Sequence, residues 1–357
     1  MNMGDTIKRL MDSIGRPVRL MEVCGTHTVA IFRLGIRDLI PEGIMLLSGP
    51  GCPVCVTAIK DVDAALAISM RKGVILATFG DMMRVPGSNK SLFNAKAEGG
   101  DVRVVYSPLD ALKIAEDNSD KKVVFFATGF ETTSPSVAGT ILEAERRGVS
   151  NFYIYSVHKT VPPALKALLD SGEVRVDGFI LPGHVSTVIG SVPYGFMASD
   201  YKKPSVITGF DAGDILSGIQ MILEQLASGR AEVEIQYKRV VRMEGNPKAV
   251  AVLNKCFEPD DANWRGIGAI PMSGLRLREE FGHRDIRSVF SLDVPEAEDN
   301  ATACSCGEVL KGVKVPTDCK LFGKACTPDR PVGPCMVSSE GSCAAYFKYK
   351  AVGKIKI

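Results

Sequence analysis

The sequence has no long apolar run. None of its apolar stretches approaches the roughly 18 to 20 residues that a membrane-spanning helix needs. Residues 1–15 are amphipathic and charged, unlike the apolar centre of a secretory signal peptide. We therefore expect a soluble, cytoplasmic protein without a membrane partner.

An excess of charge of one sign is also lacking. The 43 Lys and Arg residues nearly cancel the 41 Asp and Glu residues, and no long basic run occurs. Proteins that bind nucleic acid concentrate positive charge on one face, so this balance predicts no nucleic-acid partner. The apolar content of 45% supports real hydrophobic cores, and 357 residues exceed what one core usually serves, so two or three domains are expected.

Cysteine, by contrast, is plentiful and unevenly distributed. A cytoplasmic protein keeps its thiols reduced, so clustered cysteines indicate metal or redox chemistry rather than structural disulfides. Cys256 stands alone in an expected helix and is interpreted as a small buried apolar residue. The other nine form an N-terminal group, Cys24, Cys52 and Cys55, and a C-terminal group, Cys304, Cys306, Cys319, Cys326, Cys335 and Cys343.

Short apolar segments alternate with amphipathic ones over the first two thirds of the chain. Strands this apolar are typical of parallel sheets covered by helices on both faces, so we expect an α/β fold with two similar domains. Beyond Gly229 we expect short strands at 232–237 and 240–243, a helix at 247–257, and then an irregular domain that depends on metal or disulfides. The predicted units are an N-terminal helix packed on another domain (1–16), two α/β domains (17–119 and 120–228, divided near 117–121) and a cysteine-rich domain (229–357).

The first expected strand ends in Cys24-Gly25-Thr26-His27-Thr28, where a helix begins. A cysteine between a strand and a helix N-terminus lies where α/β sheets hold ligands and where the helix dipole favours a thiolate. Cys24 is therefore a candidate metal ligand or nucleophile. His27 is a candidate metal ligand, acid or base, with a hydrogen-bonded core histidine as the ordinary alternative.

The second strand ends in Gly49-Pro50-Gly51-Cys52-Pro53-Val54-Cys55. A C-x-x-C with an internal proline at a helix start resembles a thioredoxin-type dithiol, in which the dipole lowers the pKa of the first thiol. The alternatives are two buried thiols, or half of a zinc site that Cys24 and His27 would complete. The loop is not a Walker sequence, since no Gly-Lys-Ser/Thr follows.

A third polar loop, 128–135, follows the strand expected at 123–127. Ser134 as the N-cap and Pro135 at the first helical position explain part of it. Glu131 is not needed for capping and is a candidate catalytic residue, expected to point from the same sheet edge as the threonines of its loop in the second α/β domain. His158 and His184 also follow strands, although each alone is more often a loop or hydrogen-bonded histidine.

The C-terminal cysteines have the spacing C-x-C-x12-C-x6-C-x8-C-x7-C. Zinc ribbons use two close C-x-x-C pairs, which this segment lacks, whereas iron-sulfur clusters accept widely spaced thiolates. A four-iron cluster uses four cysteines, which would leave two for a dithiol beside it. A cysteine-rich zinc domain is the alternative.

With CGTHT, GPGCPVC, TGFETTSP and the C-terminal cysteines in this order, the chain resembles the HypD family of hydrogenase maturation factors over nearly its whole length. The resemblance implies two α/β domains facing a cleft and a third domain that binds a [4Fe-4S] cluster. The family spacing C-x14-C-x6-C-x16-C maps the cluster ligands onto Cys304, Cys319, Cys326 and Cys343. It leaves Cys306 and Cys335 as an adjacent redox pair, similar to that of ferredoxin:thioredoxin reductase.

The resemblance also implies a function. With the small protein HypC, a HypD protein builds the Fe(CN)2CO unit of [NiFe]-hydrogenase, and Cys24 would bind the iron with His27 nearby. Cyanide would arrive as a thiocyanate on HypE. Release of this cyanide consumes two electrons, which the thiols of Cys52 and Cys55 can hold. A cluster passes electrons one at a time, so Cys306 and Cys335 would collect them and supply them in pairs.

This reading predicts a metallocofactor-assembly scaffold that is a monomer when alone, with a [4Fe-4S] cluster and transiently bound iron carrying cyanide and carbon monoxide. Whether the protein is also an enzyme stays open. The rivals are a cluster-dependent thiol-disulfide oxidoreductase and a zinc-dependent structural or interaction protein.

Overall fold

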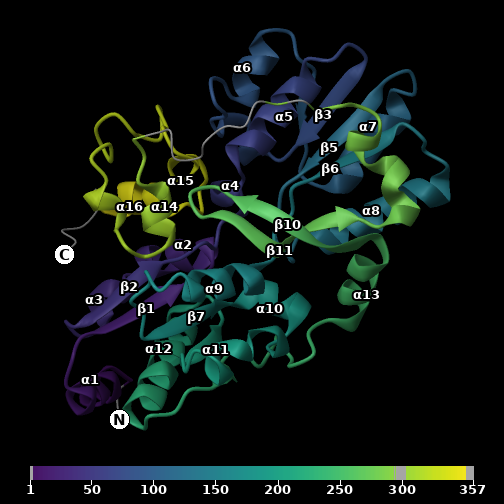
Figure 1. The fold of residues 1–357 in the computed structure, drawn as a ribbon. Coiled ribbons are helices and arrows are strands. Elements are labelled where there is room, and N and C mark those ends of the chain that lie inside the picture. Colours follow the sequence, from purple (N-terminus) through teal and green to yellow (C-terminus); the bar gives the residue numbers. More distant parts are fainter. Residues whose placement is uncertain (1–2, 293, 295–302, 351–357) are drawn as a thin grey trace.

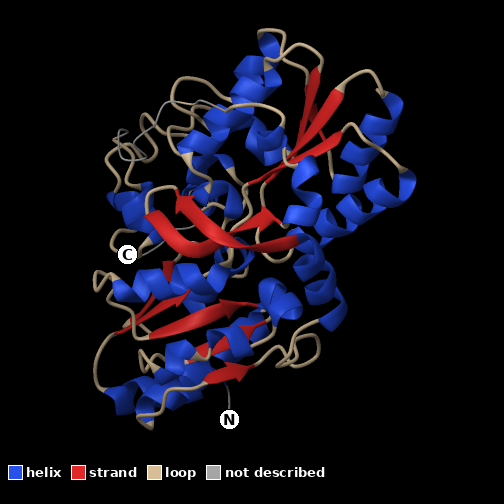
Figure 2. Cartoon of the chain, turned by 45° about the vertical axis from the view of Figure 1, so that its right-hand side comes forward, coloured by secondary structure: helices blue, strands red, loops and turns tan. Residues whose placement is uncertain are grey.

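The computed structural model describes residues 3–292, 294 and 303–350. It contains two parallel sheets, one antiparallel hairpin and a cysteine-rich C-terminal segment (Figure 1). Helices surround both parallel sheets (Figure 2), which confirms the predicted α/β class. Within the described part of the chain, no helix is both long and apolar enough to cross a membrane.

The first sheet has the strand order β2-β1-β7-β8-β9, and all its pairs are parallel. Strands β7 and β8 are buried throughout, as expected for strands covered on both faces. The strands are β1 (Val18–Glu22), β2 (Ile44–Ser48), β7 (Gly178–Pro182), β8 (Ser205–Thr208) and β9 (Val233–Ile235). The helices that accompany this sheet along the chain are α1 (Met3–Ile14), α2 (Gly25–Arg33), α3 (Ile36–Leu39), α9 (Val161–Asp170), α10 (Gly183–Ile189), α11 (Phe196–Ser199) and α12 (Ala212–Ala227).

The second sheet has the order β4-β3-β5-β6 and is also parallel. Its strands are β3 (Val74–Thr78), β4 (Val102–Val104), β5 (Lys122–Ala127) and β6 (Phe152–Ser156). Its helices are α5 (Ile59–Ser69), α6 (Leu92–Ala97), α7 (Pro108–Asp117) and α8 (Ser134–Arg147). Helix α8 begins one residue earlier than predicted, so Thr133 rather than Ser134 is its N-cap residue and Pro135 is the second helical residue.

The two sheets do not follow one another along the chain. The chain leaves the first sheet after β2, forms all four strands of the second sheet, and returns to the first at β7. The expected division at 117–121 therefore lies inside the second sheet, where β5 pairs with the earlier strand β3. Apolar strand patterns report burial but do not identify the neighbouring strand, which explains the difference.

The segment after β9 also differs in part from the prediction. Helix α13 (Pro247–Cys256) lies where a helix was expected, but 240–243 is not a strand, and β9 belongs to the first sheet. Strands β10 (Phe257–Trp264) and β11 (Gly268–Leu277) form an unpredicted antiparallel hairpin. The hairpin crosses the middle of the molecule between the two sheets (Figures 1 and 2).

The C-terminal segment is irregular, as predicted. Its helices are short apart from the last: α14 (Cys306–Leu310), α15 (Pro334–Val337) and α16 (Ser342–Lys350). The remaining elements are the helix α4 (Pro53–Val56) and the 3-10 turns η1 (Gly80–Arg84), η2 (Val192–Tyr194), η3 (Glu279–Arg284), η4 (Ile286–Ser288) and η5 (Pro316–Asp318).

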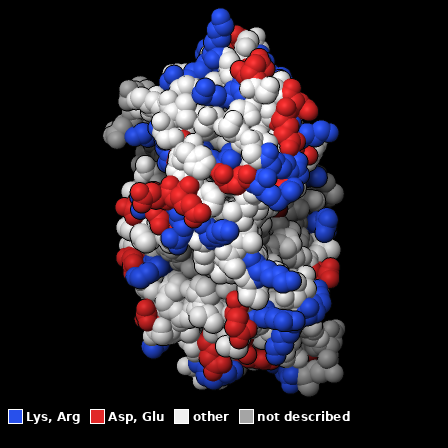
Figure 3. Space-filling view, turned by 90° about the vertical axis from the view of Figure 1, so that its right-hand side faces the viewer, with Lys and Arg blue, Asp and Glu red and all other residues white. Residues whose placement is uncertain are grey.

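Charges of both signs are mixed on the surface. On the face that Figure 3 shows, groups of Lys and Arg alternate with groups of Asp and Glu, without a field of one sign. This distribution matches the near balance of charges in the sequence.

The loops that follow β1 and β2 are in direct contact. The Gly25 N–H donates a hydrogen bond to the carbonyl of Gly51 at 3.0 Å. A Cβ atom on Gly51 would lie 2.2 Å from the backbone nitrogen of Cys24, so only glycine allows the backbones to approach this closely. The two N-terminal cysteine motifs are thereby joined through their backbones.

We predict that Gly51→Ala lowers the free energy of unfolding by roughly 1 to 3 kcal/mol, because the added methyl group forces backbone apart at Cys24. Anaerobic urea denaturation of the full chain measures this change. Gly139→Ala is the matched control, since nothing lies within 4 Å of its Cβ position and alanine favours a helix over glycine. Equal stabilities of the two variants would contradict the prediction.

Candidate functional site

Cys24 lies at the junction of β1 and α2, where the sequence placed it. It is the N-cap residue of α2 and is buried. Burial raises the pKa of the Cys24 thiol to about 12, although the backbone N–H groups of His27 and Thr26 oppose the rise. The site therefore holds a neutral thiol, which becomes a thiolate only with a cation to compensate its charge.

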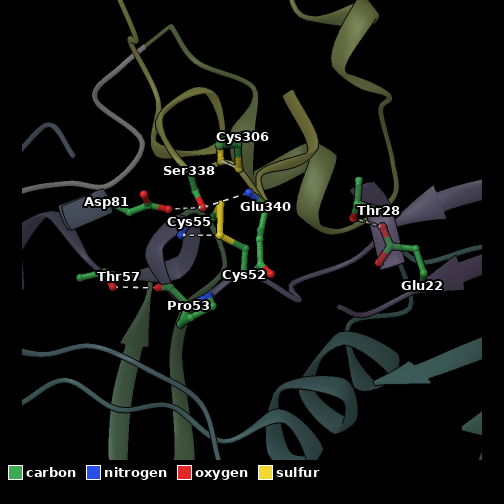
Figure 4. Close-up of a disulfide and its surroundings, with 11 residues drawn as sticks. Glu22, Thr28, Cys52, Pro53, Cys55, Thr57, Asp81, Cys306, Ser338 and Glu340 are labelled. Carbon is green, nitrogen blue, oxygen red and sulfur yellow. Dashed lines mark hydrogen bonds between the residues drawn. A yellow bond between two sulfur atoms is a disulfide. The ribbon is translucent and has the colours of Figure 1, made fainter. Parts of the chain in front are cut away.

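Glu22 supports the Cys24 loop and was not selected from the sequence. Its carboxylate accepts hydrogen bonds from the Cys24 N–H at 3.0 Å and from the Thr28 hydroxyl (Figure 4). Burial raises the pKa of Glu22 to about 7, while the bonds from Thr28 and Cys24 act in the opposite direction. A carboxylate at the end of a strand that is apolar apart from Arg19 was the available signal for this residue.

His27 is fully buried and its tautomer follows from its partners. Its Nε2 lies 2.9 Å from the Gly209 carbonyl and 2.9 Å from the Thr208 hydroxyl. A carbonyl oxygen can only accept, so Nε2 carries the proton and Nδ1 keeps a lone pair. Nδ1 is buried without a hydrogen-bond partner, and burial lowers the pKa of His27 to about 4. The ring is thus a neutral imidazole with one unused ligand atom.

His184 reaches the same edge of the first sheet. Phe210 lies between the two histidine rings, with centroids 4.5 Å from that of His27 and 4.0 Å from that of His184. His184 is exposed, and the partial loss of solvent around its ring lowers its pKa below the ordinary value. The stack makes His184 a neighbour of the Cys24 motif.

Cys52 and Cys55 form a disulfide at the start of α4 (Figure 4). Cys52 is the N-cap residue, and its sulfur accepts the Cys55 N–H at 3.3 Å. Both sulfur-bearing residues are buried. The motif thus has the geometry of an oxidised dithiol, and in this state it offers no thiolate to zinc.

All six C-terminal cysteines line one cavity, together with apolar side chains such as Val309, Phe322 and Met336. The pKa of Cys343 is raised well above its ordinary value, first by burial and then by charges on Cys306, Cys304, Cys326 and Cys319. The Sγ atoms of Cys306 and Cys335 are 2.8 Å apart. The cavity therefore contains the two residues expected as a redox pair and the four expected as cluster ligands.

The lining of this cavity has donors of the kind that bind iron-sulfur clusters. Six cysteine side chains surround one volume, together with apolar side chains. A four-iron cluster is held by four cysteine thiolates, each on a separate iron, so its ligands surround a volume rather than a point.

The N-terminal and C-terminal cysteine groups meet through short helices. Helix α15, which carries Cys335, packs against α4, which carries Cys55. Both pairs belong to one continuous core. Figure 4 shows Ser338 and Glu340 between the disulfide and Cys306.

The loop 338–340 is a second connection between the N-terminal and C-terminal cysteine groups, and it was not predicted from the sequence. Its Ser338 hydroxyl donates to Asp81 at 3.1 Å, and the Ser338 oxygen accepts the Glu340 N–H at 3.3 Å. The Thr26 hydroxyl donates to Glu340 Oε1 at 2.7 Å, next to Cys24. No spacing or periodicity marks Glu340 in the sequence, because its partners come from the other end of the chain.

Glu131 and His158 follow strands of the second sheet, so they do not share the sheet edge of Cys24 and Cys52. Burial raises the pKa of Glu131 to about 7; its Oε1 accepts the Val161 N–H at 2.9 Å, and its Oε2 has no hydrogen-bond partner. Burial also lowers the pKa of His158 to about 3. Glu131 and His158 were expected in the second α/β domain and follow strands of the second sheet, whereas His184, expected in the same domain, follows β7 of the first sheet.

Comparisons with known proteins agree with the order of the motifs. The family described as "HypD: Hydrogenase formation hypA family" matches residues 1–350. The hydrogenase maturation factor HypD of Rhizobium leguminosarum bv. viciae is 48% identical over 359 residues, which cover 98% of this chain and 93% of that protein.

Two further relatives carry the same name. HypD of Azotobacter vinelandii is 50% identical over 341 residues, covering 94% of this chain and 90% of the relative. HypD of Escherichia coli K12 is 46% identical over 336 residues, with the same shares of 94% and 90%. From these full-length similarities, we conclude that the chain belongs to the HypD family of hydrogenase maturation factors.

Proposed function

We propose that this protein is the scaffold on which, together with HypC, iron receives the cyanide and carbon monoxide ligands of [NiFe]-hydrogenase. The observation that carries the proposal is the packing of α4, with the Cys52–Cys55 disulfide, against α15 of the cysteine-lined cavity. Such packing provides a short route for electrons between a thiol pair and a cluster. The family supplies the role in hydrogenase maturation.

Cys24 and His27 are the proposed iron ligands. Cys24 sits at a helix N-terminus with a neutral thiol, and His27 keeps an unpartnered Nδ1 while its Nε2–H is fixed by Gly209. A hydrogen bond to the second ring nitrogen is how proteins commonly orient a metal-binding histidine. Binding of ferrous iron would displace the thiol proton and supply the missing charge.

Cys52 and Cys55 are the proposed source of the two electrons for cyanide transfer from a thiocyanate on HypE. In that step the S–CN bond breaks, the HypE sulfur leaves as a thiol, and cyanide binds iron. The two thiols of Cys52 and Cys55 lose two electrons and two protons as their disulfide forms, which is the state in the structure. One proton goes to the leaving sulfur and the other to the surrounding acceptors.

Restoring the dithiol requires two electrons, which we assign to the Cys306 and Cys335 pair. Their sulfurs lie 2.8 Å apart, so they can form a disulfide as they give up two electrons by thiol-disulfide exchange. Cys304, Cys319, Cys326 and Cys343 would hold a [4Fe-4S] cluster, which when bound supplies electrons one at a time.

Glu131 is proposed as a proton store for this chemistry. A carboxyl with a pKa of about 7 exchanges protons near neutral pH. Tyr194 is close enough to interact with the charges of both Glu131 and Cys24. Burial raises the pKa of Tyr194, and negative charge on either of these residues raises it further. We also propose that the protein works in the cytoplasm. It would be a monomer until it binds HypC and HypE.

A cluster-dependent thiol-disulfide oxidoreductase is the second candidate, favoured by the same disulfide and close pair. It would need only the cysteines of α4 and the cavity. Only the scaffold function requires Cys24 and iron-bound cyanide and carbon monoxide. The experiments below therefore distinguish the two functions.

We predict infrared bands of iron-bound cyanide and carbon monoxide on the wild-type protein isolated with HypC and HypE, and their loss in Cys24→Ala. Cys256→Ala is the matched control, because Cys256 is a buried free thiol in α13, remote from both motifs in sequence. Bands that persist in Cys24→Ala would refute the assignment of the iron ligand. Absence of bands in the wild type, with thiol-disulfide exchange intact, would favour the oxidoreductase.

We predict that the double variant Cys52→Ala with Cys55→Ala loads iron but acquires cyanide at least about tenfold more slowly, because it cannot form the disulfide that accompanies cyanide transfer. The rate of appearance of the cyanide bands measures this effect. A wild-type rate in the double variant would show that the electrons take another route.

We predict that the anaerobic protein is brown, with an absorbance band at about 400 nm, as expected of thiolate-bound iron-sulfur clusters. Cys319→Ser should lose this band, whereas Cys256→Ser should keep it. Stoichiometric zinc with no band in the wild-type protein would support the zinc-dependent alternative and refute the cluster.

A further inference from the structure

The loop 208–210, at the end of β8, holds the ring of His27. The Thr208 hydroxyl and the Gly209 carbonyl each lie 2.9 Å from the Nε2 of His27. The ring of Phe210 stacks on the imidazole, with centroids 4.5 Å apart and an interplanar angle of 26°. Three consecutive residues therefore fix both the plane of the imidazole and the nitrogen that carries its proton.

This loop lies directly against a carboxylate in the first turn of α12. A Cβ atom on Gly209 would lie 2.1 Å from Oδ2 of Asp214, so only glycine allows the loop to pass this close. Hydrogen bonds from the Arg239 guanidinium, at 2.7 Å to Oδ1 and 2.5 Å to Oδ2, lower the pKa of Asp214 to about 2. The carboxylate is therefore ionised at neutral pH and only accepts hydrogen bonds.

Gln236, in the segment that follows β9, joins the loop to this carboxylate. Its Oε1 accepts the Gly209 N–H at 3.2 Å, and its Nε2 donates to Oδ1 of Asp214 at 3.0 Å. The orientation of the amide follows from its partners, since a backbone N–H only donates and a carboxylate only accepts. Gln236 therefore ties the residue whose carbonyl binds His27 to an ionised group of α12.

The next residue, Tyr237, supports the ring that stacks on His27. Tyr237 packs edge-on against Phe210, with centroids 6.1 Å apart and an interplanar angle of 86°. The Arg239 guanidinium lies over the Tyr237 ring, with its Cζ 4.4 Å from the centroid. One short segment, 236–239, thus contacts both the loop 208–210 and the carboxylate beside that loop.

We propose that Gln236 is a positioning residue for iron binding: through Gly209 it keeps the proton of His27 on Nε2 and so leaves Nδ1 as the ligand atom. This inference rests on the proposed function, since it takes His27 as an iron ligand. A neutral imidazole can carry its proton on either nitrogen, and the hydrogen bond at one nitrogen decides whether the other is available to a metal. Among the described residues, Nδ1 of His27 has no hydrogen-bond partner, so the contacts at Nε2 determine the position of the proton.

The first measurement is the position of the His27 proton in the anaerobic full chain before iron is added. Labelling of histidine with ¹⁵N gives only four imidazoles to resolve by nuclear magnetic resonance, and His27→Gln identifies the signals of His27. We expect the wild type to carry the proton on Nε2 alone. Gln236→Met keeps an unbranched side chain of similar length but removes the amide, so we expect a mixture of the two tautomers.

The second measurement is the binding of ferrous iron, titrated anaerobically, after subtraction of the binding that remains in Cys24→Ala. Loss of a group that orients a metal-binding histidine commonly weakens metal binding about 10- to 100-fold, so we expect the Kd of Gln236→Met to rise at least about tenfold. Gln220→Met is the matched control, because Gln220 is also partly buried and its amide donates to a carboxylate, that of Glu224 within α12. This control should leave the tautomer and the Kd unchanged.

Gln236→Glu separates positioning from general support of the fold. Its carboxylate still accepts the Gly209 N–H, and the Arg239 guanidinium at Asp214 offsets the added charge. A tautomer mixture and a raised Kd in Gln236→Met, both restored to wild-type behaviour in Gln236→Glu, support the inference. A single tautomer or an unchanged Kd in Gln236→Met, equal changes in both variants, or loss of the fold in both overturns it.

Iron binding in the wild type that does not exceed that of Cys24→Ala would instead refute the proposed iron site. That failure appears in the wild-type protein, whereas failure of the inference alone appears only in the Gln236 variants. The two failures are therefore distinguishable within one set of titrations.

Discussion

The packing of α4 against α15 is the contact on which the rest of the site depends. Helix α4 starts where the chain leaves the first sheet, and α15 belongs to the cysteine-rich segment near the other end of the sequence. The loop 338–340 reinforces the same junction through its hydrogen bonds with Thr26 and Asp81. Without this contact, the Cys52–Cys55 disulfide and the Cys306 and Cys335 pair would belong to separate regions.

Burial gives the site a common electrostatic character. The thiol of Cys24 and the carboxyls of Glu22 and Glu131 have raised pKa values, and the imidazole of His27 has a lowered one. Each shift favours the neutral form of its group, because a charged form loses solvation on burial. A site composed of neutral ligands is well suited to receive a cation, whose charge then stabilises the thiolate.

The sequence predicted the local chemistry better than the assembly. Cys24 and Cys52 lie at strand-to-helix junctions as expected, because the apolar strands and the residues at helix starts are local signals. The exchange of strands between the sheets was not predicted, and it brought His184, expected in the second domain, to the sheet edge of Cys24. Glu340 was missed because its importance arises only from a contact between distant segments of the chain. The hairpin was missed because β10 contains Pro259, Asp260 and Asp261, which strands generally avoid.

The exchange of strands has a mechanical consequence. Two direct connections join the sheets, one through α4 and α5 and the other through α9, and the reactive disulfide lies on the first. A rotation of one sheet relative to the other would therefore twist the backbone that carries Cys52 and Cys55. The position of the dithiol is therefore tied to the arrangement of the two sheets, because its backbone is one of the segments that connect them.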